Sequence, residues 1–234
     1  MIELQDFRAA RRAISSHMRL TPVFKADNFA SKSVFDAPDR LPEMFLKLEN
    51  MQVTGSFKAR GAMNAALALD EDKRANGLCT ASGGNHGMGV IHAARILGVP
   101  VKIFLPTNTP KPKVEKLRAQ GVDVALTGAV WDDANRAAMD HARQSNMAYI
   151  HPFADPKVIA GQGTIALEML EQQPDLDTLV VAIGGGGLIS GVATAARLLR
   201  PAIRIIGVEP TGAATLFESL KAGEVVTLPT VNTA

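Results

Sequence analysis

The sequence has little of several features on which other classes of protein depend. Its single cysteine, Cys79, excludes an internal disulfide and a multi-cysteine metal site, and suits a reducing compartment. It has one tryptophan, one tyrosine and a net charge of +2 with both signs interspersed, so it offers no basic, aromatic stripe for nucleic acid. It also has no apolar run long enough to span a membrane, and its charged N-terminus lacks the core of a signal peptide. We therefore expect a cytoplasmic protein without nucleic-acid or membrane partners.

What the sequence does contain is a regular alternation of two patterns. Apolar runs of strand length alternate with helical periodicity from about residue 44 onward, which indicates crossover connections and a mostly parallel α/β sheet. We predict strands over residues 44–49, 78–81, 101–105, 122–126, 148–150, 179–183 and 203–208. We predict helices over residues 4–18, 57–69, 86–97, 112–119, 132–145, 156–172, 188–199 and 213–222. Residues 25–40 show no periodicity and are predicted to be mostly loop.

Four consecutive glycines, residues 184–187, separate an apolar strand from an apolar helix; we call them the tetraglycine loop. Bare backbone amides at a helix N-terminus form a cradle for an anion, most simply a phosphate. The alternative is a flexible turn between strand and helix.

A second loop, T-G-S-F-K-A-R-G at residues 54–61, also precedes a helix; we call it the lysine loop. Ser56 is the predicted N-cap, which places Lys58 in the first helical turn. A cation there faces the positive end of the helix dipole, so the position favours an amine that can lose its proton. Such an amine suits imine chemistry with a carbonyl cofactor, whereas the alternative is an ordinary solvated lysine.

A third loop, A-S-G-G-N-H-G at residues 81–87, follows a short apolar strand; we call it the serine loop. Ser82, Asn85 and the glycine amides between them suit a carboxylate at a helix N-terminus. The alternative is that Ser82 or Asn85 only caps the helix, and His86 alone is more often structural than a ligand.

All three loops are predicted at the carboxyl ends of strands, where ligands gather. A phosphate cradle, an amine and a carboxylate cradle together describe pyridoxal phosphate carrying an amino acid.

In combination, T-G-S-F-K, A-S-G-G-N-H-G and G-G-G-G-L resemble the fold type II pyridoxal-phosphate enzymes, specifically the threonine/serine dehydratase and serine racemase group. Residues 151–164, H-P-F-A-D-P-K-V-I-A-G-Q-G-T, resemble the same group. The resemblance implies an α/β fold of two parallel-sheet domains in a homo-oligomer. It implies a small domain at residues 77–151, inserted in a large cofactor-binding domain of residues 1–76 and 152–234. Family members usually continue past this point, so we expect a C-terminal part that is absent from this sequence.

The resemblance also assigns roles by motif position. It implies that Lys58 carries the cofactor as an imine, that Phe57 packs beside the cofactor ring and that Asn85 contacts the ring hydroxyl. The phosphate-binding residues would be Gly184, Gly185, Gly186, Gly187 and Leu188. The residues around the substrate carboxylate would be Ser82, Gly83, Asn85 and His86.

The activity that this resemblance implies is α,β-elimination of a hydroxyamino acid, threonine or serine, to a keto acid and ammonia. Racemases of the group carry a second serine after the position of Ser82, where this sequence has Gly83, so elimination is favoured over serine or 3-hydroxyaspartate racemisation. Some relatives bind a divalent cation, for which Glu209 and the carbonyl of Ala213 are candidates without a further carboxylate nearby.

Two other readings remain open from the sequence. A GxGxxxG pattern at Gly185, Gly187 and Gly191, with Glu209 ending the next strand, also fits an NAD(P)-dependent dehydrogenase. That reading leaves the lysine and serine loops unexplained. A catalytically silent binding fragment is the other alternative.

Overall fold

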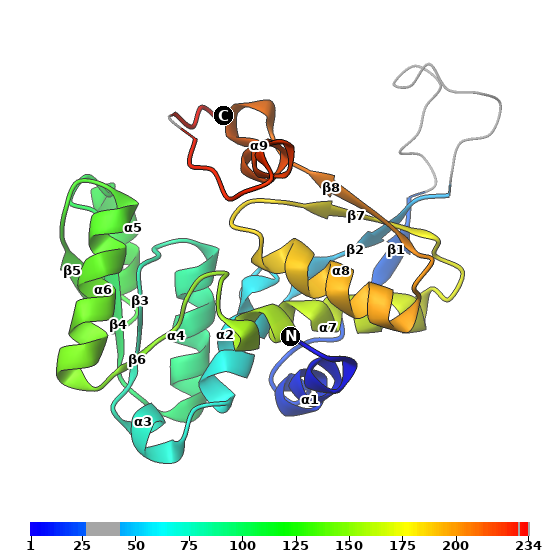
Figure 1. Cartoon of the computed structure of the whole chain (residues 1–234). Coiled ribbons are helices and arrows are strands. Elements are labelled where there is room, and N and C mark those ends of the chain that lie inside the picture. Colours follow the sequence, from blue (N-terminus) through cyan, green and yellow to red (C-terminus); the bar gives the residue numbers. More distant parts are fainter. Residues whose placement is uncertain (27–42, 229, 234) are drawn as a thin grey trace.

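The computed structural model describes residues 1–26, 43–228 and 230–233, which form an α/β protein. Figure 1 shows two groups of elements side by side, one around a four-stranded sheet and the other around helices α1, α7 and α8. Helix α2 and the chain before α7 connect the two groups. No helix in the described ranges is long and apolar enough to cross a membrane.

The first group is a three-layer unit with a parallel sheet in the order β5-β4-β3-β6. Its strands are β3 (Leu78–Thr80), β4 (Val101–Leu105), β5 (Asp123–Leu126) and β6 (Ala148–Tyr149). Helix α6 (Trp131–Ser145) covers one face, where its alanines pack on Cys79 and Phe104. Helices α4 (Asn85–Leu97) and α5 (Lys111–Arg118) cover the other face, where Ile91 and Leu117 pack with Ile103. Burial of both faces explains why these strands read as continuous apolar runs.

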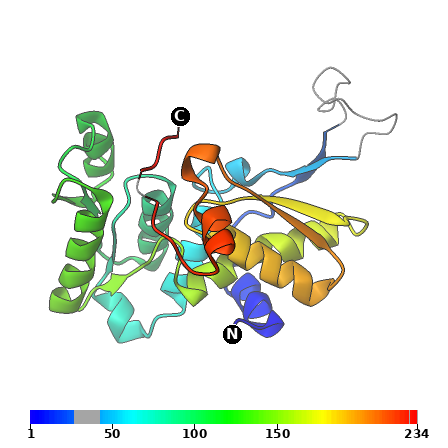
Figure 2. The ribbon, with the colours of Figure 1, turned by 45° about the horizontal axis from the view of Figure 1, so that its top comes forward.

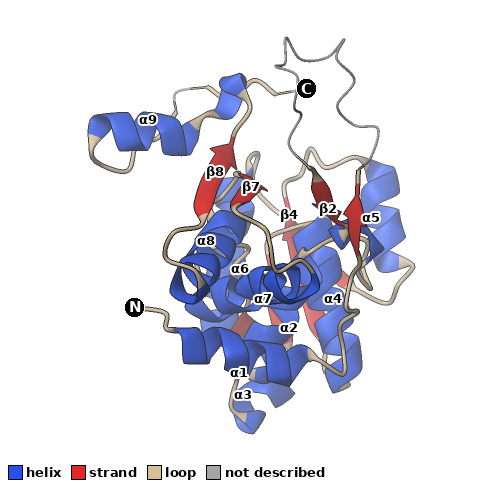
Figure 3. Ribbon diagram, turned by 90° about the vertical axis from the view of Figure 1, so that its right-hand side faces the viewer, coloured by secondary structure: helices blue, strands red, loops and turns tan. Residues whose placement is uncertain are grey.

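The second group contains α1 (Leu4–Ile14), α2 (Lys58–Leu67), α7 (Pro156–Gln172) and α8 (Gly187–Leu199). Strands β7 (Thr178–Ala182) and β8 (Arg204–Val208) form a parallel pair, and β1 (Val23–Lys25) and β2 (Phe45–Lys47) form an antiparallel pair. Figure 3 shows α8 and α7 beneath β7 and β8. Phe7 of α1, Leu179 of β7 and Val192 of α8 meet residues of α7 in one buried cluster, so α7 is the centre of this group.

Helix α7 contacts its neighbours through glycine. A Cβ on Gly161 would lie 2.6 Å from the Cα of Gly61 in α2, and one on Gly191 of α8 would lie 2.7 Å from the backbone nitrogen of Gly163. Backbone therefore meets backbone on both sides of α7, and any side chain at these positions would force the helices apart.

A buried ion-pair network ties β2, α2 and α7 together. Arg60 bonds Glu49 (Nε to Oε2, 2.8 Å) and Glu168 (Nη1 to Oε1, 2.6 Å), and the side chain of Arg60 is only 1% exposed. Lys47 of β2 donates to the other oxygen of Glu168 at 2.6 Å. Two cations thus face two carboxylates, which leaves no member of the network uncompensated.

The predicted alternation of strands and helices is confirmed, but the strands form three sheets rather than one. Strand β1 and the short helix α3 (Glu71–Ala75) were not predicted. The first helix ends at Ile14, earlier than predicted. Most of the predicted loop at 25–40 lies outside the described residues, although Lys25 belongs to β1.

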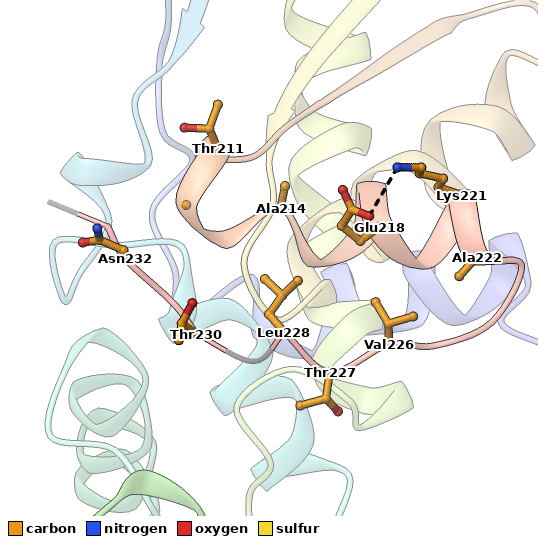
Figure 4. Close-up of a pocket in the computed structure, with 11 residues that line it drawn as sticks. Thr211, Ala214, Glu218, Lys221, Ala222, Val226, Thr227, Leu228, Thr230 and Asn232 are labelled. Carbon is orange, nitrogen blue, oxygen red and sulfur yellow. Dashed lines mark ion pairs between the residues drawn. The ribbon is translucent and has the colours of Figure 1, made fainter.

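A cavity of about 730 Å³ lies beside α9 (Thr215–Ala222), away from the three predicted loops. The segment after α9 returns to the turn before it, where the Asn232 backbone nitrogen donates to the Gly212 carbonyl at 3.0 Å (Figure 2). Figure 4 shows the lining side chains, including the Glu218 and Lys221 ion pair. None of the predicted site residues lines this cavity, so it is not the candidate active site.

Candidate active site

The lysine, serine and tetraglycine loops converge on one segment, residues 151–154, which we call the aromatic turn. The Lys58 Nζ donates to the Pro152 carbonyl at 2.7 Å. The ring of Phe153 lies against the tetraglycine loop, and it also stacks on Trp131 with centroids 6.4 Å apart. Trp131 in turn donates from Nε1 to the Ala81 carbonyl at 2.7 Å, directly before Ser82. The lysine and tetraglycine loops therefore adjoin the aromatic turn directly, and the serine loop is linked to it through Trp131.

Lys58 is the first residue of α2 and has a partly buried side chain. Its amine makes no ion pair within the described ranges, and it lies 5.4 Å from the centroid of the Phe57 ring. Burial lowers the pKa of Lys58, because the charged form is poorly solvated there. A larger neutral fraction is what an amine needs in order to act as a nucleophile or base.

The predicted N-cap of this helix is wrong by one residue. The N-cap is Phe57, which makes no side-chain cap, and the buried hydroxyl of Ser56 has no hydrogen-bond partner. The prediction followed the chemical preference for serine at N-caps, whereas the helix begins only after the Phe57 ring has packed against the core around α7.

The serine loop leads into α4, whose first residue is Asn85 and whose N-cap is Gly84 without a side-chain cap. The Gly84 backbone nitrogen donates to Ser82 Oγ at 3.3 Å. Neither Ser82 nor Asn85 is the N-cap of α4, so the capping alternative does not account for this loop. Its amides lie at the N-terminus of a 13-residue helix, which is suited to a carboxylate.

His86 is buried, and its Nε2 lies 3.0 Å from the Ile150 carbonyl. A carbonyl only accepts hydrogen bonds, so Nε2 carries the proton and Nδ1 is an acceptor, for which the described residues offer no donor. Burial lowers the pKa of His86 to about 4. The side chain is therefore neutral at physiological pH and joins the serine loop to β6.

The tetraglycine loop ends in a left-handed residue, Gly186, with φ of 81°, and α8 begins at Gly187. An added Cβ on Gly185 would lie 2.6 Å from the Phe153 ring, and one on Gly187 would lie 2.7 Å from the Phe153 carbonyl oxygen. The next residue, Leu188, packs against the core around α7. Backbone amides are thus left uncovered at a helix N-terminus, as an anion cradle requires.

Glu209 is engaged in a different way from that expected. Its two carboxylate oxygens accept from the backbone nitrogens of Leu216 and Phe217, each at 2.9 Å, which anchors the start of α9. In the described part of the chain no three His, Cys, Asp or Glu residues gather as metal ligands. The structure thus lends no support to a cation site here, and Glu209 is not free to bind a ribose as the dehydrogenase reading needs.

Sequence reasoning missed the residues that join the loops: His151, Phe153 and Trp131. Their contacts link segments far apart in the chain, so no local pattern signals them.

The site fits pyridoxal phosphate on its own geometry. A partly buried amine without a carboxylate partner among the described residues, a glycine loop packed on Phe153 at one helix N-terminus, and a second helix N-terminus lie around the aromatic turn. These three features match an aldehyde, a phosphate and the carboxylate of an amino acid.

Comparison with known proteins agrees with this geometry. The sequence profile described as "Pyridoxal-phosphate dependent enzyme" matches residues 14–234. The chain is 41% identical over 223 residues to L-threonine ammonia-lyase of Thermotoga maritima, covering 95% of this chain and 54% of that protein. It is 40% identical over 231 residues to serine racemase of Arabidopsis thaliana, covering 99% and 68%. The structure of maize serine racemase superposes with a TM-score of 0.90 at 36% identity, covering 98% of this chain and 68% of that one. The chain spans about half the length of several curated relatives it matches.

Proposed function

The chain belongs to the pyridoxal-phosphate dependent enzyme family, and on this premise we propose that it catalyses α,β-elimination of threonine or serine to a keto acid and ammonia. The observation that carries the proposal is the Lys58 amine, partly buried, unpaired with any described carboxylate and 2.7 Å from the Pro152 carbonyl beside the tetraglycine loop. The similarity to L-threonine ammonia-lyase supports the reaction class.

Each loop has a role in this proposal. The backbone amides of residues 184–187, with Leu188, bind the cofactor phosphate, and Phe57 and Asn85 contact its ring. The serine loop binds the substrate carboxylate at the N-terminus of α4 through Ser82, Gly83, Asn85 and His86. When bound, pyridoxal phosphate supplies an electron sink for the pair of electrons released at the substrate α-carbon.

Lys58 performs the proton transfer. Its neutral amine takes the α-proton as general base, and the lowered pKa increases the fraction of enzyme in which the amine is ready to accept it. The β-hydroxyl leaves and, together with the proton taken from the α-carbon, becomes water; a second water hydrolyses the released enamine to the keto acid and ammonia. Deep burial of His86 with a pKa of about 4 makes it a poor competing acid.

Serine or 3-hydroxyaspartate racemisation is the second candidate, favoured by the similarity to serine racemases. A proton donor opposite Lys58 would be needed at Gly83. A Cβ there would lie 2.9 Å from Leu105 Cδ2 and 3.1 Å from Lys113 Cε, so a serine would require both side chains to move. Elimination therefore remains the main proposal.

We further propose that residues 77–151 form a small domain and that residues 1–76 and 152–234 form the large one. The four-stranded sheet supports this division, because it has buried clusters of its own on both faces. The proposed partner is a small amino acid, in a homo-oligomeric protein of the cytoplasm.

The test is spectroscopic and chemical. The purified protein mixed with pyridoxal phosphate should absorb visible light as an imine, and Lys58→Ala should lose that band while Lys116→Ala, on the exposed side of α5, keeps it. Keto acid release should then be measured with serine, threonine and 3-hydroxyaspartate. Normal keto acid release by Lys58→Ala would refute the mechanism, and absence of the band in the unaltered protein would favour a silent binding fragment.

A further inference from the structure

The aromatic turn is held by one side chain. His151 Nδ1 accepts from the backbone nitrogens of Phe153 at 3.1 Å and Ala154 at 2.8 Å. Both donors are backbone N–H groups, so Nδ1 must carry no proton. The imidazole ring also packs edge-on against Phe153, with centroids 4.7 Å apart, and against Tyr149 at 6.0 Å.

Pro152 and Phe153, which follow His151, contact the lysine loop and the tetraglycine loop, and Phe153 reaches the serine loop through Trp131. The Pro152 carbonyl accepts the Lys58 amine at 2.7 Å. The Phe153 ring fills the space beside Gly185, where a Cβ would lie 2.6 Å from it. The same ring stacks on Trp131, which bonds the carbonyl that precedes the serine loop. A change in the conformation of the turn would therefore displace the amine, the anion cradle and the serine loop together.

We propose that His151 is a positioning residue, whose unprotonated Nδ1 fixes the aromatic turn and thereby aligns the Lys58 amine with the tetraglycine and serine loops. The relevance of this alignment to catalysis rests on the proposed function. His151 touches no reacting atom in this proposal and acts through Pro152 and Phe153.

The groups around His151 make this arrangement sensitive to acid. Burial lowers the pKa of His151, the Lys58 charge lowers it further, and Asp155 opposes them. His86, which interacts electrostatically with His151, is itself neutral near neutral pH, and the rings of Tyr149 and Phe153 carry no charge there. Protonation places a hydrogen on Nδ1 and removes both hydrogen bonds at once. The turn is therefore intact at neutral pH, and it is lost as the pH falls below the ordinary histidine value through the lowered pKa.

Trp131 supplies the measurement, because it is the only tryptophan in the chain and stacks on Phe153. The full chain without cofactor is titrated from neutral to acid pH while tryptophan fluorescence and circular dichroism are recorded. We expect a fluorescence change below the ordinary histidine pKa of about 6.5, with helix content preserved.

Two variants separate the hydrogen-bond acceptor at position 151 from the positive charge that the imidazole gains in acid. In His151→Asn the amide oxygen takes the place of Nδ1 and does not titrate, so its fluorescence should match the unaltered protein at neutral pH and lack the acid transition. In His151→Leu the acceptor is lost, so its neutral-pH fluorescence should already resemble the acid form. Any transition that belongs to His86 persists in His151→Asn and is thereby distinguished.

Cofactor binding is the second readout. Loss of the turn in His151→Leu should weaken pyridoxal phosphate binding about tenfold, the effect of one to two net hydrogen bonds, and His151→Asn should restore it. An acid transition that is unchanged in His151→Asn, or neutral-pH fluorescence of His151→Leu equal to that of the unaltered protein, would overturn the proposal. Because the fluorescence test needs no cofactor, it can fail while the Lys58 test succeeds, and the reverse.

Discussion

Removal of the Arg60 guanidinium should be among the most damaging single changes in this protein. In Arg60→Met the bonds to Glu49 and Glu168 disappear, and Lys47, 2.6 Å from Glu168, remains as the only cation of the network. Breaking a buried ion pair by removing one partner costs about 3–5 kcal/mol. For a chain of this length each kcal/mol lowers Tm by about 2–4 °C, so we expect a decrease of roughly 6–20 °C.

The chain offers a matched control at the surface. Arg11 also makes a two-pronged pair with a glutamate, Glu171, but the two side chains are 33% and 60% exposed, against 1% and 7% for Arg60 and Glu168. Exposed pairs contribute only about 0–1 kcal/mol, so Arg11→Met should lower Tm by no more than about 4 °C. Thermal unfolding followed by circular dichroism measures both variants.

A pH series sharpens this comparison. A buried carboxylate that has lost its cation has a raised pKa in the folded state, so it favours the protonated form. The deficit of Arg60→Met relative to the unaltered protein should therefore shrink as the pH falls toward the ordinary range of glutamate. Equal decreases in Tm for Arg60→Met and Arg11→Met at neutral pH would refute the argument that burial sets the cost.

Three other experiments test the cofactor site and the buried core. Gly185→Ala should weaken pyridoxal phosphate binding, measured by absorbance titration, because its Cβ overlaps Phe153, whereas Lys116→Ala, on the exposed side of α5, should bind normally. Burial raises the pKa of the Cys79 thiol to about 11, so thiol reagents at pH 8 should label it only after the protein is unfolded. Gly83→Ser should raise the ratio of racemisation to elimination, measured by chiral chromatography against keto acid release. An unchanged ratio would contradict the placement of residue 83 opposite Lys58.

Much of the fold could be predicted because its parallel strands are rich in apolar residues. Leu78, Ile103 and Leu179 are buried residues of short, mostly apolar runs, and such runs are recognised without tertiary information. The family resemblance found in three short motifs is likewise confirmed by the profile match. In contrast, β1 has three residues that are largely exposed and pairs with a strand about twenty residues later, and α3 is five residues without a buried side chain. Neither element carries an apolar period.

The site was predictable only in part for a related reason. Residue type and position before a predicted helix are enough to identify Lys58, Ser82 and the glycines, so the three loops can be predicted from the sequence. What holds them together is the contact of Phe153 with glycines 32 or more residues later and with Trp131 22 residues earlier. Such contacts depend on how the sheet group and the helix group meet, which local patterns do not encode.

The glycine contacts of α7 affect which lengths of ligand the site can accommodate. Lys58 stands at the start of α2 and the anion cradle at the start of α8, and both helices rest on α7 backbone to backbone. Side-chain rotamer changes hardly alter the spacing of helices that meet backbone to backbone, so the separation between the starts of α2 and α8 is stiff. The two helix starts therefore select ligands by their length, and a molecule that spans them binds with little loss of protein conformational freedom.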